Sequence, residues 1–394
     1  PALSDLDNSG SLEIIFISGN DTSATLYAIN NAGDDVTGFP VTIPERIVTG
    51  PAVADIDGSG SADIVIVTLD SNVYAIDAYG SLKSGFPFLT SDGIQAPATL
   101  ADMDGDQDLE IITGNEGGNV YVLHHDGSIM ASFVTEHPIR GGVSIADLDR
   151  NGQMELLFSG LDQYVHAWDP IVNGEISGWP VHIGSGSISE PIVVDLDNDL
   201  DLEVITVTIE GTIYISHHDG SFYQNFPYIS QDSIHSTPAI GDLDYDGDYE
   251  LIVVTDVNLK VLDILDDKGD QYSWKAYRGN SYRDGYYDVS LSSLSMDNII
   301  PPKEFSLGKN YPNPFNPVTN IPYGLPEDMM VMITVHDLKG RVVKTLVDRR
   351  QSAGHNSIFW NGTNDLGAPV STGLYFYRIQ SSNFSQTKKM IFLK

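Results

Sequence analysis

The chain has 394 residues, of which 41% are apolar and 19% are charged, so it can bury a sizeable core and is not a disordered acidic polymer. Its net charge of −35 is unevenly placed, because residues 1–301 hold 49 acidic and 9 basic residues, a charge of −40, and a body this acidic excludes nucleic acid and anionic lipid surfaces as partners. The chain has no cysteine, which excludes disulfides and thiol chemistry, and it has no apolar run of transmembrane length.

An acidic nine-residue segment recurs six times in the first 250 residues. Its first copy reads Asp-Leu-Asp-Asn-Ser-Gly-Ser-Leu-Glu, and successive copies begin 50, 47, 45, 48 and 47 residues apart. Acidic groups at positions 1, 3, 5 and 9 are typical of a loop that wraps a cation, and a period near 47 residues is typical of a propeller blade. The six copies are residues 5–13, 55–63, 102–110, 147–155, 195–203 and 242–250.

Each repeat carries four short β segments. The first leads into the acidic loop. The second is apolar on both faces, as in residues 14–17, 64–67 and 251–254, which predicts a strand buried between stacked sheets. The third ends at a tight turn. The fourth carries Gly-aromatic-Pro in the first, second and fourth repeats and Phe-Pro in the fifth, and proline there suits an outer edge; the third and sixth repeats lack the motif. The pattern predicts an all-β fold: a β-propeller with six visible four-stranded blades over residues 1–289. The chain opens on the lead-in of a repeat, so we expect further sequence, with any export signal, upstream of Pro1.

The acidic loops predict calcium sites. Calcium takes six to eight oxygen ligands in flexible geometry, whereas magnesium prefers an octahedral shell with several waters. Three or four carboxylates within nine residues repel one another unless a cation lies among them, which weighs against turns that bind nothing. We therefore expect up to six Ca²⁺ ions and no catalytic role for these residues. The candidate ligands are Asp5, Asp7, Ser9, Glu13, Asp55, Asp57, Ser59, Asp63, Asp102, Asp104, Asp106, Glu110, Asp147, Asp149, Asn151, Glu155, Asp195, Asp197, Asp199, Glu203, Asp242, Asp244, Asp246 and Glu250.

The loops are expected to differ in strength. The third and sixth offer four carboxylates, whereas the first, second and fourth have serine or asparagine at position 5 and therefore one carboxylate fewer. Position 6 requires a positive φ, which glycine adopts readily in four copies, whereas Gln107 and Leu200 depart from the glycine pattern. Leucine there should cost about 1–2 kcal/mol, which weakens the fifth loop. On this ranking, replacing Asp244 should cost more stability than replacing Asp7.

Two histidine pairs, His124-His125 and His217-His218, occupy equivalent turns. Neighbouring residues of a hairpin point to opposite faces, so we expect exposed histidines there rather than a transition-metal site.

Residues 1–285 resemble the FG-GAP/VCBS family of calcium-binding propellers, because the acidic loop, the apolar strand and the period agree in all six copies. This family includes the heads of integrin α-subunits and many secreted bacterial proteins, and its propellers usually have seven blades. The resemblance implies either a six-bladed propeller or a further blade upstream.

The composition changes after residue 289. Residues 290–304 form a linker rich in Ser, Asn and Pro, and residues 302–394 hold 11 basic and 6 acidic residues. Alternating apolar segments over residues 305–394 predict an Ig-like β-sandwich. The segment Asn-Tyr-Pro-Asn-Pro-Phe-Asn-Pro at 310–317, Trp-Asn-Gly at 360–362 and Ser-Thr-Gly-Leu-Tyr at 371–375 resemble the C-terminal sorting domain of the type IX secretion system. The resemblance implies export through the outer membrane of a Gram-negative bacterium, followed by release or attachment at the cell surface.

Together these features predict a secreted or cell-surface, calcium-binding propeller that acts as an adhesion module. We expect it to bind a glycan or a surface protein, and to meet the type IX secretion machinery through residues 305–394. We expect a monomer with no transmembrane segment and no nucleic-acid partner. The alternative is a catalytic or non-catalytic part of a larger secreted hydrolase or polysaccharide lyase. Enzymatic activity within these residues is not favoured, since 9 basic residues in the first 301 argue against an anionic substrate.

Overall fold

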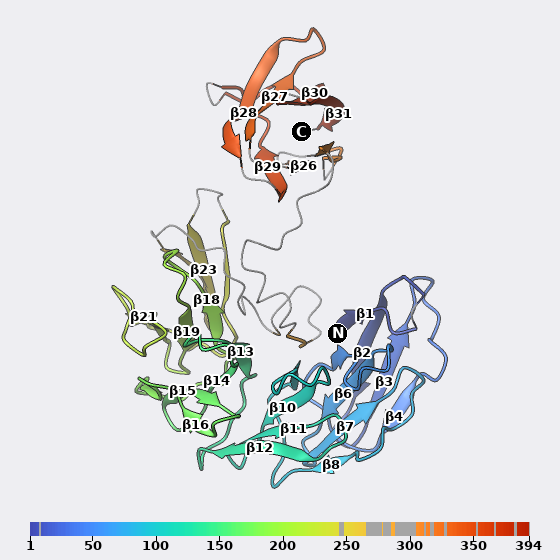
Figure 1. Cartoon of the computed structure of the whole chain (residues 1–394), viewed down its shortest axis with the longest axis vertical. Helices are drawn as coiled ribbons and strands as arrows, with labels where there is room; N and C mark the ends of the chain where they lie inside the picture. The colour runs from blue at the N-terminus through green and yellow to red at the C-terminus, as the bar shows by residue number, and fades with distance from the viewer. Residues whose placement is uncertain are drawn as a thin grey trace. The chain divides into compact units, whose positions relative to one another are not determined.

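The structure is a computed structural model, and it describes residues 1–7, 9–243, 248–264, 278, 285–287, 305–310, 313–315, 319–326, 329–351, 354–365, 368–381 and 384–393. All pairs of neighbouring named strands in these residues are antiparallel. The chain divides into two compact units, Pro1–Ser293 and Leu294–Lys394 (Figure 1). The predicted linker, residues 290–304, lies outside the described residues. No helix in the described part of the chain is long and apolar enough to cross a membrane.

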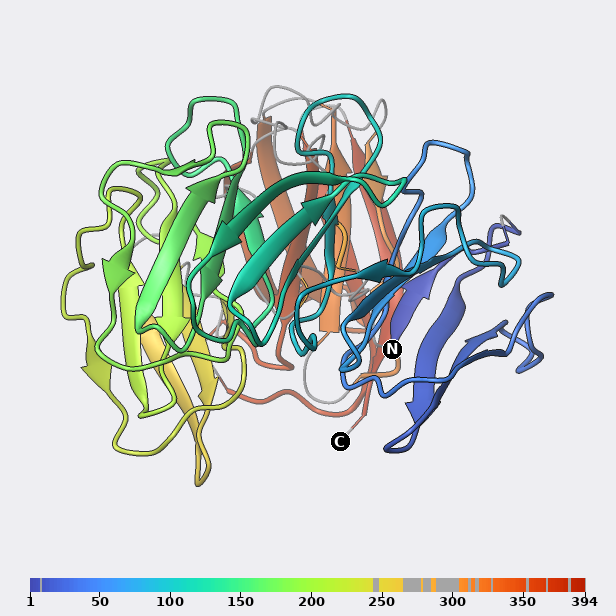
Figure 2. The same ribbon diagram turned by 90° about the horizontal axis from the view of Figure 1, so that it is seen from below.

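The first unit is a β-propeller in which each repeat forms one sheet. Figures 1 and 2 show these sheets following one another side by side in chain order, from blue to yellow. The first three sheets are β1 (Ala2–Ser4), β2 (Glu13–Gly19), β3 (Ala24–Ile29) and β4 (Val41–Ile43); β5 (Ala52–Ala54), β6 (Asp63–Val67), β7 (Asn72–Ile76) and β8 (Phe88–Leu89); and β9 (Thr99–Ala101), β10 (Glu110–Gly114), β11 (Asn119–Leu123) and β12 (Ile129–Val134). The next three are β13 (Ser144–Ala146), β14 (Glu155–Ser159), β15 (Tyr164–Asp169), β16 (Gly174–Glu175) and β17 (Val181–His182); β18 (Ile192–Val194), β19 (Glu203–Val207), β20 (Thr212–Ser216) and β21 (Tyr228–Ile229); and β22 (Ala239–Gly241), β23 (Tyr249–Val254) and β24 (Leu259–Ile264).

Apolar strands on the inner side of the sheets produce the stacking. Every residue of β6, β10, β14 and β19 is buried, as predicted for strands that are apolar on both faces. A separate hydrophobic cluster lies between each sheet and the next, from the first to the sixth. The innermost strands also lie side by side, β1 against β5 and β5 against β9. The predicted propeller is confirmed.

The first and sixth sheets differ from the four between them. In β2, Ile14 is 44% exposed, and in β23, Val254 is 49% exposed. The expectation that residues 14–17 and 251–254 are buried on both faces is therefore wrong for part of each strand. The physical reason is that, among the described residues, no hydrophobic cluster joins the first and sixth sheets, so each of them buries one face only.

The glycine of the Gly-aromatic-Pro motif is required by contact with the next blade. A Cβ atom at Gly38 would lie 1.9 Å from the carbonyl oxygen of Tyr79, in the turn of the second blade. Gly85 and Gly178 meet the carbonyl oxygens of Asp126 and Asp219 at 1.8 and 1.9 Å in the same way. The motif therefore marks a place where one blade fits closely against its neighbour.

Late residues of the first unit return to the innermost strands. Leu100 in β9 accepts a hydrogen bond from the amide of Tyr287 and donates its own amide to the carbonyl of Gly285. Arg278 is buried, and its guanidinium donates to the carbonyl oxygens of Gly50 and Pro51, just before β5. These residues thus bind the inner sides of the second and third sheets.

The second unit is a sandwich of two sheets. One has the order β25 (Ser306–Leu307), β26 (Thr319–Leu325) and β29 (Gly354–Trp360); the other has the order β28 (Val342–Gln351), β27 (Met329–His336), β30 (Gly373–Gln380) and β31 (Ser385–Phe392). Both sheets contribute to one core. The predicted β-sandwich is confirmed, while its Ig-like character stays a prediction.

Residues from two of the three C-terminal sequence motifs, those at 310–317 and 360–362, hold this sandwich together. Phe315 stacks on Phe392 at 5.0 Å and lies 5.5 Å from the ring of Trp360. The amide of Asn310 donates to the Tyr377 hydroxyl at 3.0 Å, and its side chain donates to Thr319 at 2.9 Å. Asn310, Phe315 and Trp360 are therefore core and bracing residues of the fold.

Candidate metal-binding loops

Each acidic loop joins the innermost strand of a blade to the second strand. The antiparallel register pairs the residue before position 1 with position 9, as in Ser4 with Glu13 and Ala101 with Glu110. Position 9 therefore lies beside position 1, although seven residues stand between them in sequence. This pairing closes the loop into a ring of oxygen atoms.

The carboxylate at position 1 is held by backbone amides of its own loop. Asp5 accepts hydrogen bonds from the amides of Ser9 and Gly10, both at 2.9 Å. Asp102 accepts from Gly105 at 2.7 Å and from Gln107 at 3.1 Å. The equivalent bonds to Asp55, Asp147 and Asp195 come from Gly60, Gly152 and Asn198.

The carboxylate at position 9 is buried and binds the amide at position 2. In loop four, Glu155 Oε2 accepts from the Leu148 amide at 2.7 Å, and in loop five, Glu203 Oε2 accepts from the Leu196 amide at 2.8 Å. Glu13, Asp63, Glu110 and Glu250 make the same bond. Sequence reasoning missed this bond, although an apolar residue at position 2 of every copy marks it.

The structure brings the predicted ligands together in several loops. In three groups, one oxygen from each carboxylate lies within 4.8 Å of the others: Asp5, Asp7 and Glu13; Asp55, Asp57 and Asp63; and Asp102, Asp104 and Asp106. At position 5, Asn151 and Asp199 each accept the amide two residues on, and Ser9 does so at 3.4 Å. Ser59 is turned inward, with its hydroxyl 3.3 Å from Asp55. The predicted ligands Asp244 and Asp246 lie outside the described residues.

Loops four and five contain buried carboxylate oxygens with no hydrogen-bond partner in the described part of the chain. These include Glu155 Oε1, Asp147 Oδ1, Asp195 Oδ2 and Asp197 Oδ1. Glu155 and Asp195 are completely buried. Burial raises the pKa of Glu155 to about 8, and it raises the pKa of Asp195 as well. A buried carboxylate that lacks a donor is unfavourable on its own, and a cation beside it removes that cost.

Two positions adopt left-handed backbone in the second, third, fourth and fifth loops, where the structure describes both. Position 6 has a positive φ in all five described copies, including Gln107 (78°) and Leu200 (79°), which confirms the prediction for this position. Position 4 is also left-handed, at Gly58, Gly105, Arg150 (59°) and Asn198 (60°), which the sequence analysis missed. The two reversals turn successive side chains toward one centre.

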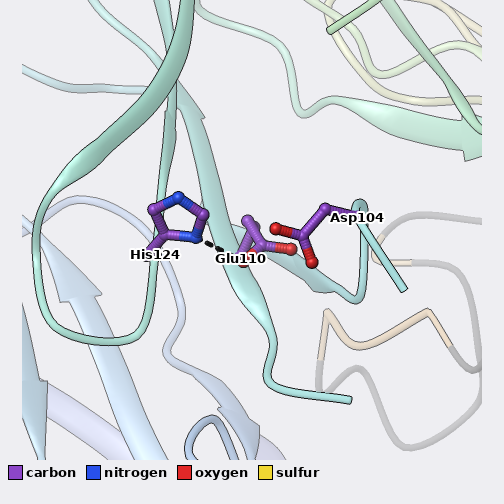
Figure 3. A group of neighbouring side chains, drawn as sticks. All are labelled: Asp104, Glu110 and His124. Carbon is purple, nitrogen blue, oxygen red and sulfur yellow. Dashed lines mark hydrogen bonds and ion pairs between the residues drawn. The ribbon is translucent and has the colours of Figure 1, made fainter. Parts of the chain in front are cut away.

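The histidine pairs are closer to the loops than predicted. His124 Nδ1 lies 3.0 Å from Glu110 Oε1, and Glu110 and Asp104 lie together with this ring (Figure 3). His217 lies 3.1 Å from Glu203 in the fifth blade. Each ring belongs to the turn after the third strand of its blade, so it approaches position 9 from the neighbouring strand. Both rings are half-buried, and the prediction that these two are simply exposed is wrong.

Loop two has a different partner. Lys83 Nζ lies 2.6 Å from Asp57 Oδ2 and 2.7 Å from Asp63 Oδ2. Burial acts to raise the pKa of Asp57, but the hydrogen bond and charge of Lys83 outweigh it and lower that pKa to about 2. Sequence reasoning missed this contact. Beside it lies a cavity of 540 Å³, lined among others by Asp77, Tyr79 and His125.

Two stretches of the chain match known protein families. Residues 309–393 match the secretion system C-terminal sorting domain. Residues 102–158, which contain the third and fourth acidic loops, match the FG-GAP-like repeat. No curated protein matches the chain. Both resemblances drawn from the sequence are confirmed.

Several solved structures resemble the chain at low identity. The biofilm matrix protein Bap1 of V. cholerae is 13% identical, with a TM-score of 0.47, and the alignment covers 99% of this chain and 65% of Bap1. Sqt1 of Saccharomyces cerevisiae is 13% identical, with a TM-score of 0.48, covering 64% of this chain and 68% of Sqt1. PorZ, a bacterial surface component of the type-IX secretion system of Porphyromonas gingivalis, is 13% identical, with a TM-score of 0.35, covering 96% of this chain and 51% of PorZ. The chain thus spans less than two thirds of the length of Bap1 and about half that of PorZ.

Proposed function

The chain is a secreted or cell-surface protein of a Bacteroidetes-type Gram-negative bacterium, with FG-GAP-like repeats ahead of a secretion system C-terminal sorting domain, and from this we propose that its first unit is a calcium-loaded binding module. The sorting domain accounts for delivery to the outside of the cell. The propeller accounts for a rigid body that carries loops on its two ends. Calcium is the component that would make this body stable outside the cell.

The observation that carries the proposal is the set of unpartnered buried oxygens in loops four and five. Glu155 and Asp195 are completely buried, and each has an oxygen without a hydrogen-bond donor among the described residues. Leaving such a group unpaired costs about 1–3 kcal/mol, and more for a charged one. A hard divalent cation with oxygen ligands removes this cost, and calcium tolerates the irregular geometry of a nine-residue loop.

The residues that would hold the ion are those at positions 1, 3, 5 and 9. In loop three these are Asp102, Asp104, Asp106 and Glu110, with the carbonyl of Asp108 as a further oxygen. The bound ion would supply charge neutralisation and a link between the first and second strands of the blade. Because position 9 begins the second strand, the link would fix the inner strands of the propeller.

We propose that the exported propeller binds a glycan or a protein of the cell surface, as an adhesion module would. Its first 301 residues carry 40 more acidic than basic groups, which favours a neutral or cationic ligand over an anionic one. Variable loops at the ends of the blades are the surfaces that such a ligand would contact.

The test of the calcium proposal is a count of bound ions. The full chain, freed of calcium by chelator, should bind several calcium ions per molecule in equilibrium dialysis and should not bind equal numbers of magnesium ions. The calcium-loaded chain should then retain a ligand on a glycan array or on a panel of surface proteins, and chelator should release it. Ligand retention that is unaffected by chelator would contradict a calcium-dependent module.

The export step has its own test. In a host with the type IX system, deletion of residues 305–394 should trap the protein in the periplasm, and fusion of those residues to a foreign exported protein should carry it to the surface or the medium. A deletion variant that still reaches the surface would show that another part of the chain directs export.

A further inference from the structure

The side chain of Lys83, from a later segment of the second blade, reaches into the second acidic loop. Lys83 Nζ bonds to both Asp57 Oδ2 and Asp63 Oδ2, the carboxylates at positions 3 and 9. The Lys83 side chain is 13% exposed, and that of Asp63 is 3% exposed, so the contact is shielded from water. Together with Asp55, these are the carboxylates that the loop would otherwise turn toward a calcium ion.

The lysine stands at a position that is apolar in other blades. The amide of Lys83 donates to the carbonyl of Ala75, and Val36, Ile176 and Tyr223 make the same bond in the first, fourth and fifth blades. All three of these side chains are buried or packed against the hydrophobic clusters. The ammonium group of the second blade therefore replaces apolar atoms at the side of the loop.

The second loop also has the shortest side chain at position 9. Asp63 stands where the other five copies have glutamate. Its oxygen lies 3.3 Å from the Ile56 amide, whereas the glutamates of loops one, three, four and five make this bond at 2.7–2.9 Å. The side chain of Asp63 is one methylene group shorter, so its carboxylate lies farther from the position-2 amide, and it bonds to the Lys83 ammonium group as well.

We infer that Lys83 is a built-in cation that takes the place of calcium in the second loop, so that calcium binds only the other loops. This inference rests on the proposed calcium function. An ammonium group is a compact charge with three donors, and two of them bridge positions 3 and 9 as a bound ion would. The joint between β5 and β6 is then independent of external calcium.

The test replaces the residues of the second loop site that differ from the first loop site. The first loop has the same residues at positions 1, 3 and 5, with Glu13 and Val36 in place of Asp63 and Lys83. The double variant D63E/K83V should bind one more calcium ion per chain than the parent in equilibrium dialysis. The matched control is Lys260→Met, because Lys260 pairs with Asp232 at 3.8 Å, away from the acidic loops. This control should leave the calcium count unchanged.

A second measurement uses Lys83→Val alone. In chelator this variant should melt several degrees below the parent, because Asp57 and Asp63 lose their counter-ion, and calcium should abolish this difference. A variant with the same melting temperature as the parent in chelator would overturn the inference.

The outcomes separate the two proposals. If the parent binds calcium and D63E/K83V binds no additional ion, the inference is overturned and the proposed function stands. If the parent binds none but the double variant binds one, the proposed function is overturned and the inference is supported. If neither protein binds calcium, both are overturned.

Discussion

His166 Nε2 lies 2.7 Å from Asp162 Oδ2, and its other ring nitrogen lies 2.5 Å from Glu175 Oε1. The ring is buried, stacks on Phe158 at 4.9 Å and has Phe133 at its edge. Burial acts to lower the pKa of His166, but the hydrogen bonds to the two carboxylates outweigh it and raise that pKa to about 9. The fourth blade therefore contains an imidazolium that is charged at neutral pH.

We expect this imidazolium to make stability depend on pH above neutrality. An unfolded histidine has a pKa of about 6.5, so the stabilisation is fully present below about pH 6.5 and is lost as pH rises through 9. The loss should be on the order of 3 kcal/mol between pH 6 and pH 10. Urea unfolding in calcium should show it as a difference between the parent and His166→Gln that shrinks with pH. A difference that stays constant over this range would contradict the assignment.

Leu200 holds a conformation that suits glycine. Its φ is 79° and the residue is 47% exposed. The left-handed backbone therefore costs free energy that packing of the side chain offsets only in part. Leu200→Gly should stabilise the protein by about 1 kcal/mol. Leu200→Ala is the matched control, because it removes the side chain but keeps the Cβ atom, and it should bring no such gain. Equal effects of the two changes in thermal unfolding would refute the backbone explanation.

Calcium removal should destabilise the first unit. With a site Kd near 10⁻⁴ M and about 2 mM calcium, each site adds about 1.8 kcal/mol. Because five hydrophobic clusters couple the six sheets, several sites act on one cooperative unit. Differential scanning calorimetry should show a fall of many degrees in chelator, reversed by calcium but not by equal magnesium. An unchanged transition would refute the cation sites.

The loops should differ by their number of carboxylates. Asp104 belongs to a loop with four of them, and Asp7 belongs to a loop with three. Asp104→Asn should therefore lower stability in calcium by about 1 kcal/mol more than Asp7→Asn, because ligand charge sets calcium affinity. In chelator the two variants should be alike. The opposite order in calcium would show that loop shape, rather than charge, sets the affinity.

Glu190 should be important for the centre of the propeller. Its carboxylate accepts the amide of Arg278 at 2.9 Å, and both residues are buried. Glu190→Ala removes this acceptor and should cost about 1–3 kcal/mol in urea unfolding. Glu190→Gln keeps an acceptor oxygen and should cost less. Equal losses from the two variants would show that the negative charge, and not the bond to Arg278, is what matters.

The sequence predicted what is local and repeated. The six loops, the positive φ at position 6 and the buried second strands of the middle blades follow from patterns a few residues long. It did not predict Lys83 or His124 at the loops, because each comes from a later strand or turn and its approach depends on hairpin register. One signal was present for Lys83: it is charged at a position where the matching residues of other blades, Val36 and Ile176, are apolar. The exposure of Ile14 depends on which sheets are neighbours in space, and a repeat pattern in the sequence does not contain that information.

The hydrogen bonds between Leu100 and residues 285–287 have a consequence for the order in which the protein folds. The ribosome releases the N-terminus of a chain first. Every described blade is therefore synthesised before residues 285–287, which bind the inner side of the blades. The native centre is then assembled from contacts of high sequence separation, which form slowly. We therefore expect packing of the first unit to be completed only after residues 285–287, which are synthesised shortly before the sorting domain.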